Sequence, residues 1–227
     1  MPSASEPPAP GMIGFPHIAR MAARGNRLAT LVSAFAFAFS AVSFYETVLK
    51  QPNLRMYVTD TLAYTRDPWG GYEVIAVPLT IANAGARDGA VISLELDVTN
   101  LASGKNEKFT SAFTADAQYF AGSDDVARRV KRPKLPFAPL AVAGRGAFAG
   151  VVLFYSAEKG SDKLIDANSK LEMTLRMLTR TADGWLEAML MGKPAHIRLQ
   201  AQIGNFLPGA LLVGDMAPLH LLTSNGR

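Results

Sequence analysis

An uncharged apolar run near the N-terminus constrains this chain more than any other feature of its sequence. The run, LATLVSAFAFAFSAVSFY, extends from Leu28 to Tyr45 without a charged side chain. As a helix, its eighteen residues would reach about 27 Å, close to the thickness of the hydrocarbon core of a bilayer. The run therefore predicts one transmembrane α-helix, which Val48 and Leu49 extend to residues 28–49.

Large apolar side chains of this run are the expected contacts with lipid, and an aromatic side chain at its end suits the membrane interface. The predicted anchor residues are Leu28, Leu31, Phe35, Phe39, Val42 and Tyr45. The preceding residues, 1–27, begin with a stretch rich in Pro, Ala, Ser and Gly. Such a stretch buries too little surface to offset its ordering entropy, so residues 1–27 are predicted to be a disordered basic tail.

The charges beside the run indicate an orientation. Arg20, Arg24 and Arg27 precede it, whereas Lys50 and Arg55 follow it. The positive-inside rule then favours a cytoplasmic N-terminus and a translocated remainder. In a bacterium, this arrangement predicts the inner membrane, with the C-terminal domain in the periplasm.

Two alternatives remain open for the same run. It could be a signal peptide cleaved after Ser43, because Ala41 and Ser43 place small residues at the required positions. It could also be a buried core helix or strand, since the repeated Ala-Phe pairs alternate as in a strand.

From Leu54 onward the apolar residues recur at every second position, the period of a β-strand. In the clearest case, Ile92, Leu94, Leu96 and Val98 alternate with polar residues. Similar segments recur at intervals of about a dozen to two dozen residues, without a long amphipathic helix between them. This pattern predicts an all-β antiparallel sandwich over residues 54–205.

Residues 206–227 form a further apolar segment, which Pro and Gly interrupt too often for a second membrane span. We expect this C-terminal extension to pack on the domain or to cover a sheet edge. An apolar tail that docks on a partner is the alternative.

Two stretches of the body carry a resemblance. The run PLTIANAGARDGAVISLELDV, from Pro78 to Val98, and the stretch Pro136–Leu140 before the segment 147–155 resemble immunoglobulin-like and fibronectin-III-like sandwiches of bacterial envelope proteins. The whole arrangement also looks like small bacterial membrane-anchored proteins. The resemblance implies an immunoglobulin-like fold but transfers no functional residues. The chain lacks a cysteine pair, which argues against an antibody-type domain.

Several kinds of chemistry find little support in the sequence. The chain has no cysteine, which excludes disulfides and thiolate catalysis or metal sites. His17, His196 and His220 lack metal-ligand spacing, and the glycine motif at 144–149 precedes a predicted strand instead of following one. We therefore expect no metal, no cofactor and no enzymatic activity.

One charged cluster is a candidate binding site. Five cations lie within seven positions: Arg128, Arg129, Lys131, Arg132 and Lys134. They could bind an anionic lipid headgroup or polymer, although a solvated loop is the simpler interpretation. The neighbouring Asp124 and Asp125 could hold calcium. Aromatic residues do not interleave with the cluster, which disfavours nucleic acid.

The leading functional hypothesis is a non-enzymatic module, tethered by a single-pass helix, that contacts another envelope protein through its exposed sheet edges. The alternatives are a binder of anionic lipid or polymer through residues 128–134, and a hydrolase.

Overall fold

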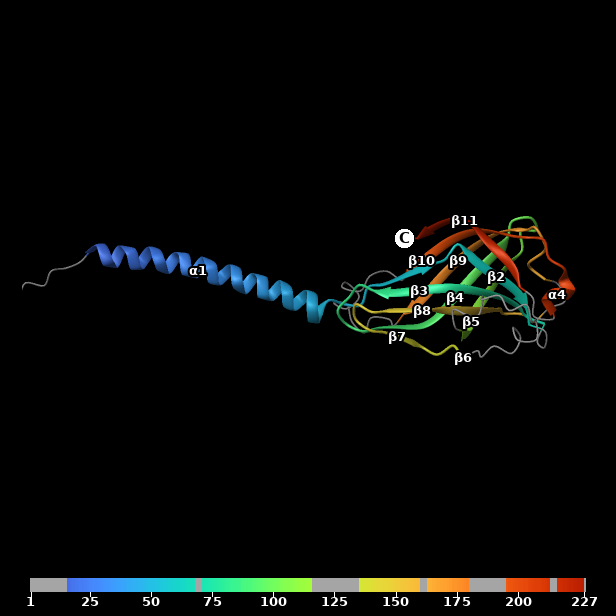
Figure 1. Ribbon diagram of the computed structural model, residues 1–227, viewed down its shortest axis with the longest axis horizontal. Coiled ribbons are helices and arrows are strands. Elements are labelled where there is room, and N and C mark those ends of the chain that lie inside the picture. Colours follow the sequence, from blue (N-terminus) through green and yellow to red (C-terminus); the bar gives the residue numbers. More distant parts are fainter. Residues whose placement is uncertain are drawn as a thin grey trace, which may run out of the picture. The chain divides into compact units, whose positions relative to one another are not determined.

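An N-terminal helix and a β-rich body make up two separate compact units, Met1–Thr47 and Val48–Arg227. The computed structural model describes residues 16–67, 71–115, 135–159, 163–179, 195–212 and 216–226. The helix α1 extends from Pro16 to Phe44 and continues into the π-helical turn η1, Tyr45–Leu49, within which the first unit ends (Figure 1).

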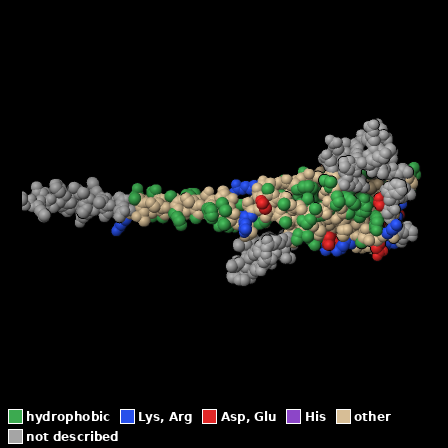
Figure 2. All heavy atoms as spheres, turned by 90° about the horizontal axis from the view of Figure 1, so that it is seen from below, with side chains coloured by type: hydrophobic (Ala, Val, Ile, Leu, Met, Phe, Trp, Pro, Cys, Tyr) green, Lys and Arg blue, Asp and Glu red, His purple; other side chains and the backbone are tan. Residues whose placement is uncertain are grey.

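The helix is apolar and exposed along its described side chains. Its segment Arg27–Leu49 is long and apolar enough to cross a membrane, by length and composition, and none of it is buried. The face seen in Figure 2 shows mainly hydrophobic side chains and backbone along this segment. Two hydroxyls of this segment are bonded within the helix: Ser40 donates to the carbonyl oxygen of Ala36 at 2.8 Å and Thr47 to that of Ser43 at 2.7 Å.

The body is built from antiparallel strands. Its elements are β1 (Leu54–Val58), β2 (Thr61–Arg66), β3 (Glu73–Asn83), β4 (Gly89–Asn100), β5 (Asn106–Ala115), β6 (Leu135–Pro136), β7 (Leu140–Val142), β8 (Ala147–Ser156), β9 (Lys170–Thr179), β10 (His196–Ile203), the short helix α4 (Pro208–Leu212) and β11 (Ala217–Gly226). Eight of these strands pair in a closed ring, in the order β5-β8-β3-β2-β11-β10-β9-β4 and back to β5. The short strands β1, β6 and β7 add to β3, β5 and β4.

The closed ring shows that the predicted immunoglobulin-like sandwich is wrong: the domain is an antiparallel β-barrel. Two pairings close it. Leu96 of β4 lies opposite Phe109 of β5 as well as opposite Leu175 of β9, and Leu62 of β2 lies opposite Leu219 of β11. A sandwich would leave edges at these places. The resemblance to immunoglobulin-like and fibronectin-III-like modules therefore reflected turn chemistry alone.

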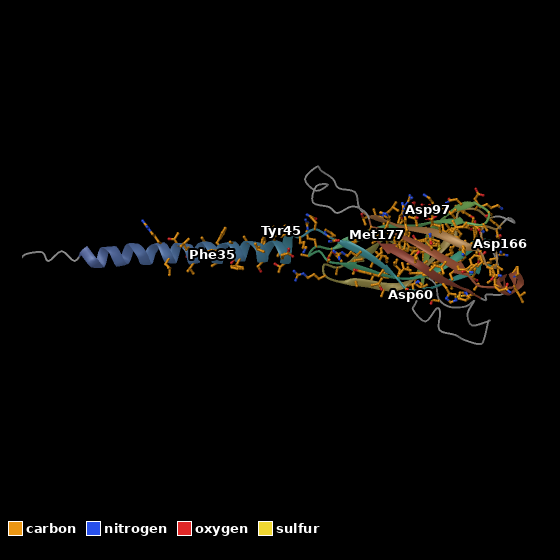
Figure 3. The ribbon with its side chains drawn as sticks, turned by 90° about the horizontal axis from the view of Figure 1, so that it is seen from above. Phe35, Tyr45, Asp60, Asp97, Asp166 and Met177 are labelled. Carbon is orange, nitrogen blue, oxygen red and sulfur yellow. The ribbon has the colours of Figure 1, made fainter. Side chains whose placement is uncertain are left out.

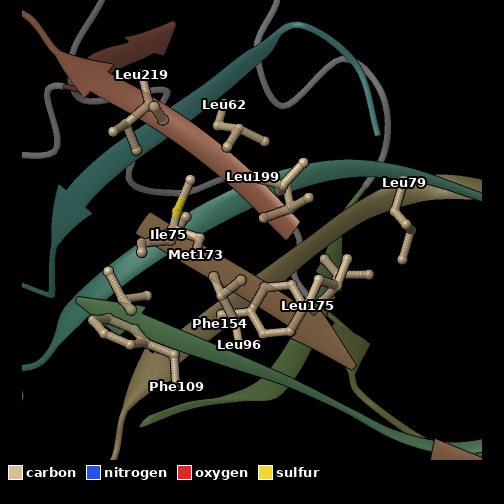
Figure 4. Close-up of a cluster of buried hydrophobic side chains, with 14 of the residues drawn as sticks. Leu62, Ile75, Leu79, Leu96, Phe109, Phe154, Met173, Leu175, Leu199 and Leu219 are labelled. Atoms are coloured by element: carbon tan, nitrogen blue, oxygen red, sulfur yellow. The ribbon is translucent and has the colours of Figure 1, made fainter. Parts of the chain in front are cut away.

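Apolar side chains fill the inside of the barrel. In Figure 4 the side chains of Leu62, Leu96, Phe154, Leu175 and Leu219 come from five strands and pack in one cluster. All five are fully buried. The two-residue alternation that predicted these strands is thus the alternation between the interior and the outer surface.

A second set of buried apolar side chains lies on the outward-facing side of the barrel wall. An outer apolar cluster consists of Ala63, Val74, Ala76, Val151 and Leu153, on β2, β3 and β8. Phe113 of β5 packs against it. The sequence places Phe109 and Phe113 on one face, but a bulge between Ser111 and Phe113 moves Phe113 to the outside, because one extra residue inverts the alternation.

The outer surface over β4, β5 and β9 is charged. Arg176 of β9 lies 3.2 Å from the carboxylate of Asp97 on β4, and Lys108 of β5 lies 3.2 Å from that of Glu95. These pairs are solvent-exposed and each adds less than about 1 kcal/mol. They mark this side as a water-facing wall.

Candidate functional site at the rims of the barrel

The residues singled out from the sequence fall into two groups. The predicted anion-binding cluster, Arg128, Arg129, Lys131, Arg132 and Lys134, lies outside the described residues, as do Asp124 and Asp125. The predicted anchor residues are described and exposed: Leu28, Leu31, Phe35, Phe39, Val42 and Tyr45. Phe35 and Tyr45 are labelled along the helix in Figure 3.

Three loops meet at the end of the barrel where the chain enters it. We call this set the proximal rim: Lys50–Asn53, Ala84–Asp88 and Ala143–Gly146. The carbonyl oxygen of Lys50 accepts hydrogen bonds from the backbone N–H groups of Ala86 and Arg87, at 3.0 and 3.2 Å. The N–H of Arg145 donates to the carbonyl of Gly85 at 2.9 Å. The three loops are therefore joined to one another by backbone hydrogen bonds.

The side chain of Asn83 holds the proximal rim together from inside. It is 3% exposed. Its Oδ1 accepts from the N–H groups of Asn53 and Gly85, at 3.1 and 2.9 Å, and its Nδ2 donates to the carbonyls of Arg87 and Val142, at 2.8 and 3.2 Å. A buried amide with all these partners fixes the loops without leaving an unsatisfied polar atom.

The loops approach each other so closely that glycine is required at two points. A Cβ at Gly85 would lie 2.1 Å from the carbonyl oxygen of Gln51, and one at Gly144 would lie 1.9 Å from that of Ala86. Both neighbours are backbone atoms, which cannot rotate away. The glycine motif at 144–149, discounted as a nucleotide fingerprint, thus serves this close approach.

The turn Ala143–Gly146 presents an arginine in an unusual conformation. Gly146 donates to the carbonyl of Ala143 at 2.9 Å, so Arg145 is the third residue of a tight turn. Its φ is 59°, in the left-handed region that glycine or asparagine ordinarily occupies. A strained, exposed cation between two glycines is unusual in a turn that serves only to connect strands.

The opposite end of the barrel has a different character. The central group at this end is the buried carboxylate of Glu73, a residue that is 2% exposed. Its Oε1 accepts from the hydroxyl of Tyr64 at 2.5 Å and from the N–H of Ile165 at 3.1 Å, and its Oε2 accepts from the N–H of Leu164 at 2.8 Å. We call these residues, with Arg66, Glu107 and Ser156, the distal rim. In Figure 3, Asp166 marks this end.

The distal rim keeps Tyr64 protonated. Arg66 donates from Nε to the hydroxyl oxygen of Tyr64 at 3.0 Å. Burial raises the pKa of Tyr64 far above its ordinary value, and the negative charge of Glu73 raises it further, against the opposing effect of Arg66. A neutral phenol that is fully buried and hydrogen-bonded is suited to holding the loop at 164–165 over the barrel end, and less suited to proton transfer with a substrate.

A second carboxyl group on this rim is partly buried. Burial raises the pKa of Glu107, and the charges of Glu73 and Glu158 raise it further, although the N–H of Glu158 donates to its Oε1 at 3.4 Å. Among the described residues, His, Asp and Glu side chains do not form a metal-binding group. His196 and His220 are exposed on the outer wall.

Outside the pairings of the closed ring, two strand edges have no ladder partner among the described residues, one on β1 and one at the end of β11. Residues 217–220 of β11 pair with β2, but a bulge at Leu222 shifts the register against β10. Within the described residues, β1 pairs only with β3, and the end of β11 beyond Leu221 pairs only with β10. One edge of each strand therefore presents unpaired backbone groups.

Only part of this arrangement could be predicted from the sequence. Asn83 ends a predicted strand in a turn motif, but its contacts with loops more than 50 residues away, such as that with Val142, leave no local signal. Glu73 and Tyr64 lie on strands predicted from their apolar neighbours, and only the structure shows that they meet.

Comparison with known proteins does not assign a family. No protein-family model matches the chain, and no curated protein matches it. Among solved structures, the chain is similar to a Bordetella pertussis protein assigned as ApaA, with 14% sequence identity and a TM-score of 0.31, over 69% of this chain and 93% of that one.

Proposed function

We propose that this chain is a membrane-tethered β-barrel module that binds a partner protein of the cell envelope by strand addition. The observation that carries the proposal is the unpaired edge at β1 and β11. The proposal places the helix in the bacterial inner membrane, the N-terminus in the cytoplasm and the barrel in the periplasm.

The tether is supported by the composition and exposure of the helix. Phe37 and Phe39 are 77% and 74% exposed. Burying apolar surface is worth about 25 cal/mol per Å². The exposure of these phenylalanine side chains is therefore unfavourable in water and favourable in lipid. Tyr45, at the end of the uncharged run, suits the interface.

The edge is suited to an extended peptide because its backbone groups have no ladder partner among the described residues. In the β1–β3 ladder, Asn53 and Ala84 form a hydrogen-bonded pair, with the N–H of Ala84 donating to Asn53 at 2.9 Å. Hydrogen-bonded pairs recur at every second residue of an antiparallel ladder, so the backbone groups of Arg55 and Tyr57 also bond to β3. The N–H and C=O groups of Leu54, Met56 and Val58 consequently point to the open edge.

The side chains along the edge define the strand that would fit. Leu54, Met56 and Val58 pack toward the core of the barrel, whereas Arg55 and Tyr57 are exposed on the outer side. An added strand would place apolar residues beside the first set. Opposite Arg55 it would place an acidic residue. The partner is therefore an extended segment with alternating apolar residues and an outward-facing carboxylate.

Site-specific photo-crosslinking in intact cells tests this function. A benzoylphenylalanine at Tyr57 or Thr223 should crosslink to the same partner, and mass spectrometry of the crosslinked peptide should identify an extended alternating segment. The matched control is Glu172, exposed on the β9 wall. Equal crosslinking from Glu172, or crosslinks between two copies of this chain, would contradict the proposal.

Two proline substitutions on β1 test the same proposal. Val58→Pro removes an N–H that faces the open edge, where proline is tolerated. Tyr57→Pro instead removes a donor to β3. We expect Val58→Pro to fold and to lose the crosslink at Thr223, while Tyr57→Pro lowers stability.

A further inference from the structure

The proximal rim carries a group of cations that the proposed function does not use. Lys50, Arg87 and Arg145 belong to its three loops, with Asp88 as the one acidic residue. Arg55 follows as the second residue of β1. Arg55, Arg87 and Arg145 are exposed. Figure 2 shows basic side chains, with an acidic one beside them, at this end of the barrel.

These cations lie in the loops at which the chain enters the barrel. Lys50 directly follows Leu49, the last residue of the apolar segment. The carbonyl oxygen of Lys50 accepts hydrogen bonds from the N–H groups of Ala86 and Arg87, and that of Gly85 accepts one from the N–H of Arg145. Arg87 and Arg145 therefore belong to loops that are bonded, directly or through one neighbouring loop, to the residue at which the chain enters the barrel.

We infer that the proximal rim binds the headgroups of anionic phospholipids in the membrane that holds the helix. This inference rests on the proposed tether and adds a second, surface contact to it. Cations near a negatively charged leaflet each favour the bound state by a factor of about five in population. The rim would thereby restrict how far the barrel tilts from the membrane.

The conformation of Arg145 is the second observation in favour of this role. At φ 59° a glycine would be less strained, and glycines already lie on both sides of it. The turn therefore keeps a long cation at its tip at a cost in backbone strain. Such strain is typical of residues retained for contact with a ligand.

The strain also provides a variant that separates folding from binding. Arg145→Gly removes the cation while relieving the backbone, so it should fold at least as well as the wild type. Combined with Arg87→Gln, it removes two charges from the proximal rim. The matched control is Lys159→Gln with Lys170→Gln, which removes two exposed charges near the distal rim.

The absence of cysteine allows the rim to be labelled at a single engineered site. A fluorophore on Ala143→Cys reports on the proximal rim, and one on Ala167→Cys reports on the distal rim; both positions are exposed. The full chain is reconstituted into vesicles of phosphatidylcholine, with or without phosphatidylglycerol, that contain a headgroup-attached quencher.

We expect the Ala143→Cys label to be quenched several-fold more in anionic than in neutral vesicles, and the difference to vanish in about 1 M salt, where the Debye length is about 3 Å. The Arg87→Gln/Arg145→Gly variant should lose the difference and the lysine control should keep it. Equal quenching in both vesicles, or an unchanged Arg87→Gln/Arg145→Gly variant, would overturn the inference while leaving the tether intact. Failure of the chain to float with either vesicle would instead overturn the tether.

Discussion

Tyr64 donates its hydroxyl to Oε1 of Glu73 at 2.5 Å, and both side chains are buried at the distal rim. The same carboxylate accepts from Leu164 and Ile165. The carboxylate of Glu73 thus joins β2 and β3 to a loop 91 residues later in the chain. The effect of Tyr64 on stability and on its pH dependence can be measured.

Replacing Tyr64 by Phe should destabilise the barrel and change its response to alkali. The loss of a buried hydrogen bond to a carboxylate costs about 2 kcal/mol. Because the pKa of Tyr64 is raised in the fold, the unfolded chain loses this proton first as the pH rises. The wild type should therefore lose stability above about pH 10, the ordinary tyrosine value. Urea unfolding at pH values below and above about 10 measures this fall in the free energy of unfolding. An equally steep fall in the Tyr64→Phe variant would contradict the prediction.

Glu107→Gln should stabilise the barrel at neutral pH. Burial and the nearby charges of Glu73 and Glu158 raise the pKa of Glu107, so the folded state holds this proton more tightly than the unfolded chain. Its contribution to stability is present below about pH 4.5 and is lost as the pH rises through the raised value. Glutamine keeps an oxygen for the N–H of Glu158 but has no charge. In thermal unfolding, Glu107→Gln should be more stable than the wild type at pH 7 but not at pH 4.

Asn83→Ala should loosen the proximal rim. It leaves the N–H groups of Asn53 and Gly85 and the carbonyls of Arg87 and Val142 without their amide partner. We expect a loss of roughly 3 kcal/mol in the free energy of unfolding. Hydrogen exchange of residues 84–88 should rise as well. Asn106→Ala, at an exposed amide that donates to the hydroxyl of Thr99, should change stability by less than about 0.5 kcal/mol.

Gly144→Ala should destabilise the rim by a different mechanism. The new methyl would lie 1.9 Å from the carbonyl oxygen of Ala86, and separating the two loops should cost about 2–3 kcal/mol. Gly204→Ala is the control, because its methyl would meet nothing within 4 Å. That change should be neutral or stabilising by about 0.5 kcal/mol. Similar stabilities of the two variants would refute the close approach.

Local pattern predicted the strands but could not predict how they close. The alternation in Leu94, Leu96 and Val98 is the same whether β4 lies in a sandwich or in a barrel, because both bury every second residue. The difference lies in the partner that β4 has besides its neighbour β5: Leu96 also lies opposite Leu175 of β9. A pairing between distant segments leaves no trace in the sequence of either one.

Bulges account for much of the remaining difference. The extra residue before Phe113 turns that side chain outward, and the one at Leu222 shifts the register of β11 against β10. Neither site contains the glycine that often marks a bulge. The segment 206–227, predicted as an apolar extension, contains α4 and β11, the strand that pairs with both β2 and β10.

Alkaline carbonate extraction of membranes tests the central claim, that the helix spans a bilayer and tethers the barrel. The full chain should stay in the membrane fraction and float with lipid on a density gradient. The variant with Phe35→Arg and Phe39→Arg should be released, because each arginine at the middle of a span costs about 3 kcal/mol. Release of the wild-type chain, with its first fifty residues intact, would show that the helix does not cross the membrane.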